Sequence, residues 1–340
     1  MYLRLSWYIS IGEYSLGMLD AVEIHKSVEL LSDTCTIKLP AQVHNKPIAQ
    51  ESATEIGDDI KGKLKRGDKV KVWLGYDIES FAGIKPAFEG YLLTINTDDG
   101  SIVLNCEDDL FLMRKAVRDK QFKAANVQQI AEYVISELGL SMKVNCSLTI
   151  RYDKFIISKA TGYDVLKKLK EETKGNIYIR VNDNGEGVLN IHPPFIERHG
   201  YVDYSFQQNI EESDLKYRTK EDRKLMIIIE RPGKDGTTIK ETYGTTGGDQ
   251  ETIKGDGMSR EAMLQAAKNR YDQQCYEGYE GSITTWLTPY VEPGYSASIE
   301  DEDYPYKNGT YYVSAVTTSM DGNSGGVRKV QLGIKLSGNG

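Results

Sequence analysis

The feature that most constrains this fold is a strand pattern that occurs twice. Each copy is a glycine turn followed by three strands of alternating apolar and polar residues. The first copy covers residues 67–76, 88–96 and 100–109, and the second covers residues 293–305, 308–318 and 326–336. Gly90 and Gly309 are predicted to hold the same place in the two copies. Such a duplication predicts that three identical chains can form a ring of six similar positions.

The composition is typical of a soluble globular chain with two or three domains. Of its 340 residues, 39% are hydrophobic and 27% are charged, and the net charge is −8. Tight binding to a phosphate backbone needs clustered Lys and Arg, so this acidic balance argues against it. Tyrosine is frequent, with 22 residues against 7 Phe and 3 Trp. This excess favours half-exposed strands over a sugar-binding surface.

Nothing in the sequence predicts a membrane span or a secretion signal. No run approaches the ~18 apolar residues that a span requires. The alternating start, with Arg4 near its beginning, predicts a strand and not a signal peptide. The cysteines are far apart and contain no CxxC pair, which predicts buried free thiols and synthesis in a reducing cytoplasm. They are Cys35, Cys106, Cys146 and Cys275.

Local patterns divide the chain into three parts. Residues 1–115 are predicted to form a first β-module, residues 116–198 an α/β middle domain, and residues 199–340 a second β-module with one helix. Residues 199–243 either belong to this second module or pack back on the earlier domains. The predicted fold class is therefore mainly β with an α/β insert (α+β). In it, two β-barrel or sandwich modules flank a small α/β domain.

Three helices are predicted from apolar stripes and capping residues. The first covers residues 126–138 with Asn126 as its N-cap, and the second begins at a capping box that starts with Thr161. The third covers residues 259–276 with Ser259 as its N-cap. The expected inner face of this third helix is Met263, Ala267, Tyr271 and Cys275.

Two segments before the third helix have contrasting patterns. The apolar run LMIIIE at residues 225–230 predicts a fully buried strand. The glycine-rich stretch at residues 244–259 lacks the GKS or GKT ending of a P-loop and the GxGxxG spacing of a dinucleotide turn. It is therefore predicted to be a flexible surface loop. The alternative is a loop that becomes ordered on contact with a neighbouring subunit.

No pattern predicts a catalytic, cofactor-binding or metal-binding residue. The four histidines, which do not have HxxxH or HExxH spacing, are His25, His44, His192 and His199. The acidic run Glu300–Asp303 lacks the calcium-loop pattern and is predicted to be a solvated hairpin tip. The run Glu107–Asp109 is predicted to begin a helical turn, where carboxylates meet the positive end of the helix dipole. The sequence does not decide whether a carboxylate pair for sugar hydrolysis is present, because the two residues of such a pair come together only in the folded chain.

The order of these motifs resembles one family, the late control protein D group of phage tails. These are baseplate hub proteins of contractile tails, related to the hub part of the type VI secretion spike. The resemblance is carried by the strand trio at residues 67–109, the helix at residues 161–175 and the C-terminal block from Ser259 to Leu336. In that block, four segments occur in the order that is typical of the family: Gly278–Trp286, Leu287-Thr288-Pro289, Pro293-Gly294 and Asn308–Val313.

The resemblance implies a structural virion protein without catalysis, a trimeric hub that adapts a six-fold tail tube to a three-fold spike. It also implies that the two β-modules, at residues 1–115 and 199–340, are tube-protein-like. The implied partners are two further copies of the chain, a tail tube protein, a separate spike protein and other baseplate proteins. DNA or an effector protein would pass through the lumen without specific binding. The implied location is the baseplate of a phage or prophage tail, or of a contractile injection particle, assembled in the bacterial cytoplasm. Because the sequence ends directly after the second module, the spike is expected to be a separate polypeptide.

Two other classes of function are kept as alternatives. One is a tail or surface protein that binds a host glycan through Tyr-rich loops. The other, less favoured, is a cell-wall hydrolase with two carboxylates ~5–9.5 Å apart across a cleft. For the hub, we expect the acidic side chains partly to face the channel, where they would repel DNA.

Overall fold

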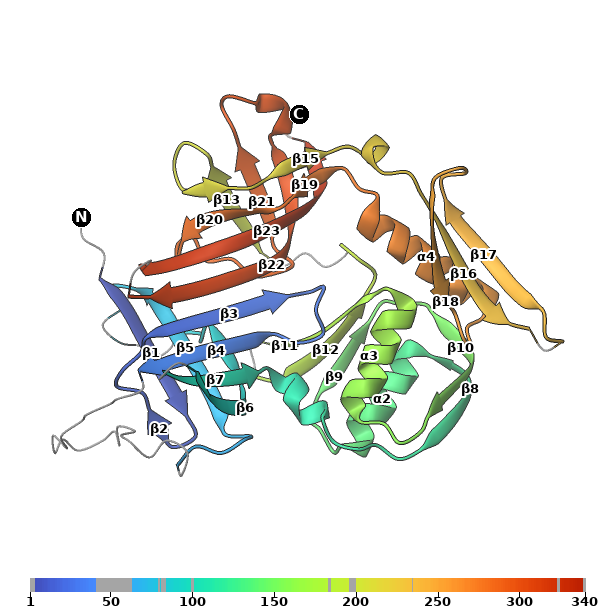
Figure 1. The fold of residues 1–340 in the computed structure, drawn as a ribbon, viewed down its shortest axis with the longest axis horizontal. Coiled ribbons are helices and arrows are strands. Elements are labelled where there is room, and N and C mark those ends of the chain that lie inside the picture. The colour runs from blue at the N-terminus through green and yellow to red at the C-terminus, as the bar shows by residue number, and fades with distance from the viewer. Residues whose placement is uncertain are drawn as a thin grey trace.

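The computed structural model describes residues 4–40, 63–78, 80, 84–98, 101–182, 185–195, 200–233, 235–322 and 325–338. Figure 1 shows two β-rich bodies stacked one above the other, beside a third body in which helices pack against small sheets. The predicted fold class, mainly β with an α/β insert, is confirmed. The domain limits at residues 115 and 198 stay a prediction.

The first β-module is built from seven strands around its own apolar core. Alternation places Val22 and Ile24 on one strand, and Cys35 and Ile37 on the next, in a single buried cluster. A short 3₁₀ helix, η1 (Asp109–Met113), follows the last strand. The strands are β1 (Leu5–Ile11), β2 (Tyr14–Ser15), β3 (Ala21–Ser27), β4 (Thr34–Pro40), β5 (Lys69–Tyr76), β6 (Phe88–Asp98) and β7 (Ser101–Glu107).

The α/β part follows, and its two helices begin where the sequence predicts. Asn126 caps α2 (Val127–Glu137) and Thr161 caps α3 (Gly162–Thr173), each through a complete capping box. Their apolar faces pack on a two-stranded and a three-stranded sheet. The strands of these sheets are β8 (Lys120–Asn126), β9 (Lys143–Cys146), β10 (Arg151–Ile157), β11 (Asn176–Val181) and β12 (Gly187–His192).

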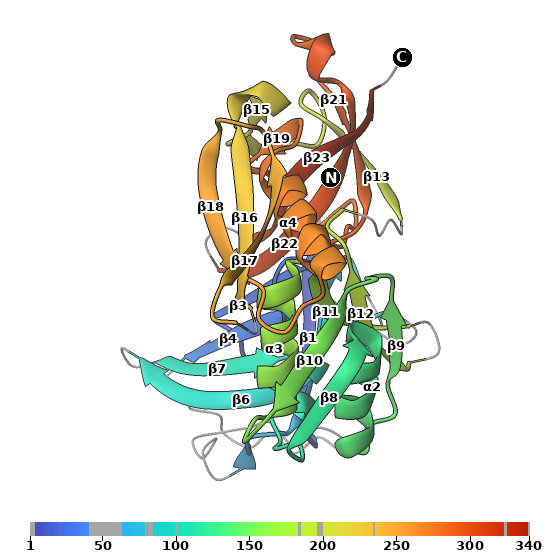
Figure 2. The ribbon, with the colours of Figure 1, turned by 90° about the vertical axis from the view of Figure 1, so that its right-hand side faces the viewer.

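A second three-stranded sheet and the third helix share the core of this α/β part. Ser259 caps α4 (Arg260–Gln274), and its predicted inner face packs into that core (Figure 2). The side chain of Asn269 donates to the carbonyl of Thr173 at the end of α3 (3.0 Å between Nδ2 and O), which fixes the two helices together. The sheet consists of β16 (Leu225–Pro232), β17 (Thr238–Gly244) and β18 (Asp249–Lys254).

Two predictions for this region are wrong. The strand β16 is buried on one face only, with Leu225, Ile227 and Ile229 inside and the residues between them half-buried. The stretch at residues 244–259 is not a loop throughout, since β18 lies within it and pairs in parallel with β16. The sequence signal was weak because β18 has the pattern DQETIK, in which only Ile253 is buried.

The second β-module again has its own core, which is rich in tyrosine. Its short 3₁₀ segments are η2 (Lys220–Asp222), near its edge, and η3 (Pro305–Lys307). Its strands are β13 (Tyr201–Ser205), β14 (Glu212–Ser213), β15 (Lys216–Arg218), β19 (Gly278–Glu280), β20 (Ser282–Trp286), β21 (Ser296–Glu300), β22 (Gly309–Asp321) and β23 (Gly325–Gly338). The antiparallel pairing of β22 with β3 joins the two modules into one continuous sheet.

The predicted repeat is confirmed in the hydrogen bonding of the two modules. Each contains an antiparallel meander, β5-β6-β7 or β21-β22-β23. The Gly67 amide donates to the Leu92 carbonyl, and the Gly294 amide donates to the Val313 carbonyl, both at 2.8 Å. The two glycines have φ of 94° and 92°. A register shift follows Leu92 in one module and Val313 in the other, so the same bulge occurs in both.

The predicted equivalence of Gly90 and Gly309 is wrong by two residues. Gly309 lies opposite Ile299, the fifth residue after the turn glycine Gly294. Gly90 lies opposite Val70, which is only the third residue after the turn glycine of the first module. Gly90 also lies within β6 and not in a turn. A Cβ atom there would be 2.2 Å from the carbonyl oxygen of Glu107 and 2.8 Å from the ring of Phe88. The close approach of β7 therefore requires glycine at this position.

Candidate functional site at the junction of the two β-modules

The junction between the modules is the antiparallel pairing of β22 with β3. It extends from Ala315 opposite Ser27 to Asp321 opposite Ala21. Side chains add to the backbone ladder, since the Nδ1 of His25 lies 2.9 Å from the hydroxyl of Thr317. An edge strand of each module is thereby covered by the other, which removes two edges open to aggregation.

A buried carboxylate from the second module anchors the first module beside this ladder. The Glu292 side chain accepts a hydrogen bond from Lys26 of β3 (3.0 Å), and Lys85 lies 3.9 Å from its second oxygen. The hydroxyl of Tyr290 also donates to Glu292. Burial alone would raise the pKa of Glu292, but Lys26, Tyr290 and Lys85 together hold it well below its ordinary value. The pair therefore stays ionised although Glu292 is 6% exposed.

A second ion pair ties the α/β part to the first module. The guanidinium of Arg180 on β11 donates to Asp33 in the turn between β3 and β4, with 2.6 Å between Nη1 and Oδ2. The other oxygen of Asp33 accepts from the amide of Ser27 at 3.0 Å. Arg180 also lies over the ring of Tyr178, 5.0 Å from its centroid. Both oxygens of Asp33 are therefore occupied by protein donors.

Asp108 completes this cluster at the start of η1, as the acidic run at residues 107–109 predicts. It accepts from the amide of Leu110 as the N-cap, from the amide of Asp33 (2.9 Å) and from the hydroxyl of Ser32 (3.1 Å). Burial and the negative charge of Asp33 raise its pKa to about 8, against the lowering effect of the two amides and of Arg180. The group is thus placed to change charge near neutral pH.

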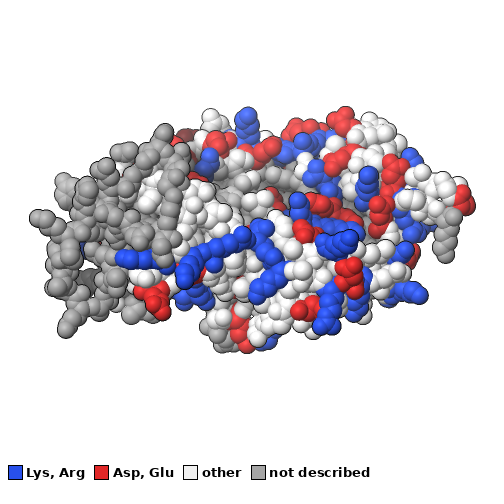
Figure 3. All heavy atoms as spheres, turned by 60° about the horizontal axis from the view of Figure 1, so that its bottom comes forward, with Lys and Arg blue, Asp and Glu red and all other residues white. Residues whose placement is uncertain are grey.

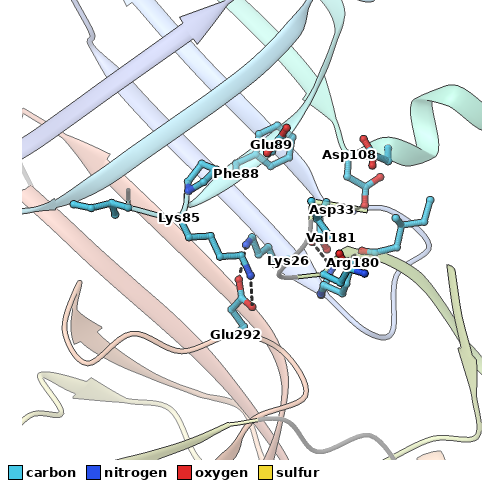
Figure 4. A pocket seen from close by; sticks show the side chains of 15 residues that line it. Lys26, Asp33, Lys85, Phe88, Glu89, Asp108, Arg180, Val181 and Glu292 are labelled. Carbon is cyan, nitrogen blue, oxygen red and sulfur yellow. Dashed lines mark hydrogen bonds and ion pairs between the residues drawn. The ribbon is translucent and has the colours of Figure 1, made fainter. Parts of the chain in front are cut away.

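These groups surround a cavity of about 480 Å³ between the two modules and the α/β part (Figure 4). The charged side chains that line it are Lys26, Asp33, Lys85, Glu89, Asp108, Asp109, Arg180 and Glu292. Asp33 and Asp108 use their oxygens to bind backbone amides and Arg180, so they act as structural acceptors rather than as an acid and a nucleophile. The arrangement fixes three parts of the chain relative to one another.

In the acidic run at residues 300–303, Glu300, Glu302 and Asp303 are exposed as predicted, and Asp301 is the exception. Asp301 is 6% exposed, and its carboxylate accepts from the amides of Asp303 and Tyr304. Among the described residues, no group of three or more His, Cys, Asp or Glu side chains could hold a metal ion. Two of the four histidines, His44 and His199, lie outside the described residues.

The cysteines are free thiols, three of them buried and Cys146 half-buried. Sequence reasoning missed one polar contact nearby. The Ser147 hydroxyl lies 2.7 Å from the Nδ1 of His192, a pair with the composition of a nucleophile and its base. The amide of Asn145 lies 3.5 Å from the other ring nitrogen, where a catalytic triad would have a carboxylate. The contact joins neighbouring parts of one sheet, and a structural role fits it best.

Figure 3 shows the face at the bottom of Figure 1, where Lys and Arg side chains form a broken band with acidic side chains beside it. At the end of η1, Arg114 forms an ion pair with Glu107 (2.6 Å). Within the described residues, no helix has the length and apolar character needed to cross a membrane.

Two solved structures that share the fold are tail proteins. The tail protein of Neisseria meningitidis MC58 has a TM-score of 0.66 at 12% identity, with 97% of this chain and 96% of that one covered. The 43 kDa tail protein of prophage MuSo2 from Shewanella oneidensis has a TM-score of 0.64 at 15% identity, covering 96% and 98%. The resemblance to phage tail hub proteins predicted from the sequence is confirmed at the level of the fold.

A component of the type VI secretion system, c3393 of E. coli, shares the fold at a TM-score of 0.58 and 10% identity. It is matched over 98% of this chain and 77% of its own, and is described as structurally similar to the T4 bacteriophage tail proteins gp27 and gp5. The family model described as YQBQ-like matches residues 51–332, which is most of the chain. The chain therefore belongs to the YQBQ-like family. No curated protein sequence matches it.

Proposed function

We propose that this chain is a structural hub protein of a phage tail or a related contractile injection machine. In this role three copies form a ring that presents six similar β-modules to a six-fold tail tube and three-fold symmetry to a separate spike protein. The observation that carries the proposal is the duplicated module, in which the turn glycine, the meander and the bulge all recur. The tail-protein fold supports it.

The charged residues at the junction, which we call the junction cluster, would fix the orientation of the modules in such a ring. They are Lys26, Asp33, Asp108, Arg180 and Glu292. A module can occupy a pseudo-six-fold position only if its orientation relative to its neighbour is fixed. The pairing of β3 with β22 and the buried Lys26–Glu292 pair fix that orientation within one chain. No catalytic step is needed for this role, and baseplate location in a virion or injection particle follows from it.

The proposal is tested by the mass of the purified chain in solution. Light scattering coupled to size-exclusion chromatography should give three times the 38.2 kDa of one chain for the chain alone, or, after addition of a tail tube protein, the mass of a complex that contains three copies of the chain. A stable monomer under both conditions would count against a trimeric hub. Specific binding of the isolated monomer to a glycan array would favour the host-surface alternative.

A further inference from the structure

We propose that the strand formed by β14 and β15 of one copy pairs with the free edge of β6 in the next copy, in the register that β22 uses for β3 within a chain. The inference rests on the proposed ring, because it names the surface by which one copy contacts the next. It is drawn from the strand order and the register of the two modules.

Both modules contain the same row of four strands. In the first module the row is β3, β4, β7 and β6, each hydrogen-bonded to the next. In the second module the first strand of the row is formed by β14 and β15 together, and the second by β19 and β20 together. The third and fourth strands are β23 and β22. The two rows are joined by β22 and β3, so the last strand of one row pairs with the first strand of the other.

The strand β14–β15 corresponds to β3 residue by residue. The register is followed from the shared bulge: the second residue after it opposes Asn105 of β7 in one module and Gln331 of β23 in the other. Across the next two strands these residues lead to Glu23 of β3 and to Asp214 between β14 and β15. Ala21 and His25 of β3 therefore correspond to Glu212 and Lys216. Among the described strands, β14 pairs only with β20, and β15 only with β19. Their outer edge is the counterpart of the edge by which β3 binds β22.

The other edge needed for the contact is on β6. Its first four residues, Phe88–Tyr91, pair with β5, and beyond them the described part of β6 pairs only with β7. In the second module the corresponding edge of β22 is the one that β3 occupies. The side chains of Thr94 and Asn96 on this part of β6 are exposed. Two complementary strand edges therefore stand at opposite ends of the eight-strand row, β15 near the top of Figure 1 and β6 near the bottom.

The register of the junction assigns the residues that meet. Transferred to the contact between copies, it places Asn96 opposite Lys216 and Thr94 opposite Arg218. The first pair takes the place of His25 and Thr317, whose side chains touch within a chain. The ammonium of Lys216 can donate to the side-chain carbonyl of Asn96, so the chemistry of the pair is complementary.

A contact between two different edges is directional. Copies joined in this way form a closed ring only if their successive rotations add up to a full turn. If the rotation at the internal junction and the rotation at the contact with the next copy are each about 60°, three copies close one ring. An open chain of copies would instead leave one β6 edge and one β14–β15 edge unpaired.

Cysteine cross-linking of the full chain tests the pairing. The variant Asn96→Cys with Lys216→Cys places two exposed thiols at directly opposed strand positions, within the Cα separation of ~4.4–6.8 Å that a disulfide needs. The matched control is Asn96→Cys with Glu212→Cys, which moves the second exposed thiol by four residues, or ~13 Å along the strand. The fold control is His25→Cys with Thr317→Cys, which should form a disulfide within each chain.

We expect mild oxidation to convert the Asn96/Lys216 variant into covalent dimers and trimers on a denaturing gel, at least tenfold more than the Glu212 control. Equal yields from both variants, or no cross-link in either while the fold control is oxidised, would overturn the pairing. Light scattering on the unoxidised variant separates the two proposals. A trimer without the cross-link refutes the pairing and leaves the ring, whereas a monomer without it, both alone and after addition of a tail tube protein, counts against both.

Discussion

The substitution Gly90→Ala tests why the first module tolerates no side chain at this position of β6. Its Cβ atom would lie 2.2 Å from the carbonyl oxygen of Glu107, 2.8 Å from the carbonyl carbon and 2.8 Å from the ring of Phe88. Glu107 is paired on both sides, with Tyr91 of β6 and Thr34 of β4, so its backbone cannot move without breaking a ladder. We expect a loss at the upper end of the range for overpacked cores, about 3 kcal/mol.

Calorimetry is the suitable assay, because several cores are expected to unfold in separate transitions. A loss of that size lowers the midpoint of the transition of a module of about 115 residues by roughly 12 °C. The control is Gly322→Ala, because a Cβ atom there meets no atom within 4 Å and the residue does not need a positive φ. A Gly90→Ala protein that melts within 1 °C of the wild type would refute the steric argument.

Two further predictions concern the charged junction. Glu292→Gln leaves the half-buried Lys26 without its anionic partner, and we expect it to reduce the free energy of unfolding at pH 7 by about 3 kcal/mol. Because the folded pKa of Glu292 is depressed, this deficit relative to wild type should shrink as the pH falls below the ordinary value of 4.5, and a deficit that does not change with pH would contradict it. Asp108→Asn should act oppositely: the folded pKa of Asp108 is raised to about 8, so its contribution is present near pH 4 and is lost as the pH rises. Wild type should therefore lose up to about 1.4 kcal/mol per pH unit more than the variant between pH 4 and 8, measured by urea unfolding, and parallel curves would count against the buried carboxyl.

Local signals predicted the elements that local interactions form. Asn126, Thr161 and Ser259 each cap the helix that they were predicted to cap, since a side chain that binds an amide three residues ahead is visible in the sequence. The repeat was predictable for the same reason, because the turn glycines and alternating strands are short-range patterns. The hub-like fold followed from the order of those patterns.

The wrong predictions concern features that depend on contacts with other parts of the chain. The places of Gly90 and Gly309 were misassigned because register depends on the partner strand. Each strand contains one glycine with a tyrosine one or two residues after it, so aligning the two glycines looks natural but gives the wrong register. The strand β18 was missed because its polar residues gain their strand conformation by pairing with β16. Asp301 was expected to be exposed to solvent, but it is buried, and its carboxylate accepts hydrogen bonds from two amides of its own turn.

The junction cluster had no signal in the sequence. Lys26 and Glu292 are 266 positions apart, and Arg180 and Asp33 are 147 apart. Each is an ordinary charged residue within its own segment. Only the meeting of three parts of the chain gives them a common site.

The most direct test of the account is electron microscopy of the assembled protein viewed along its symmetry axis, alone or on a tail tube. A ring of three chains should be seen, with six similar β-modules at steps of about sixty degrees and continuous strand pairing both within and between chains. A particle in which the two modules of one chain lie at different radii, or in which the β6 edge faces solvent, would contradict it.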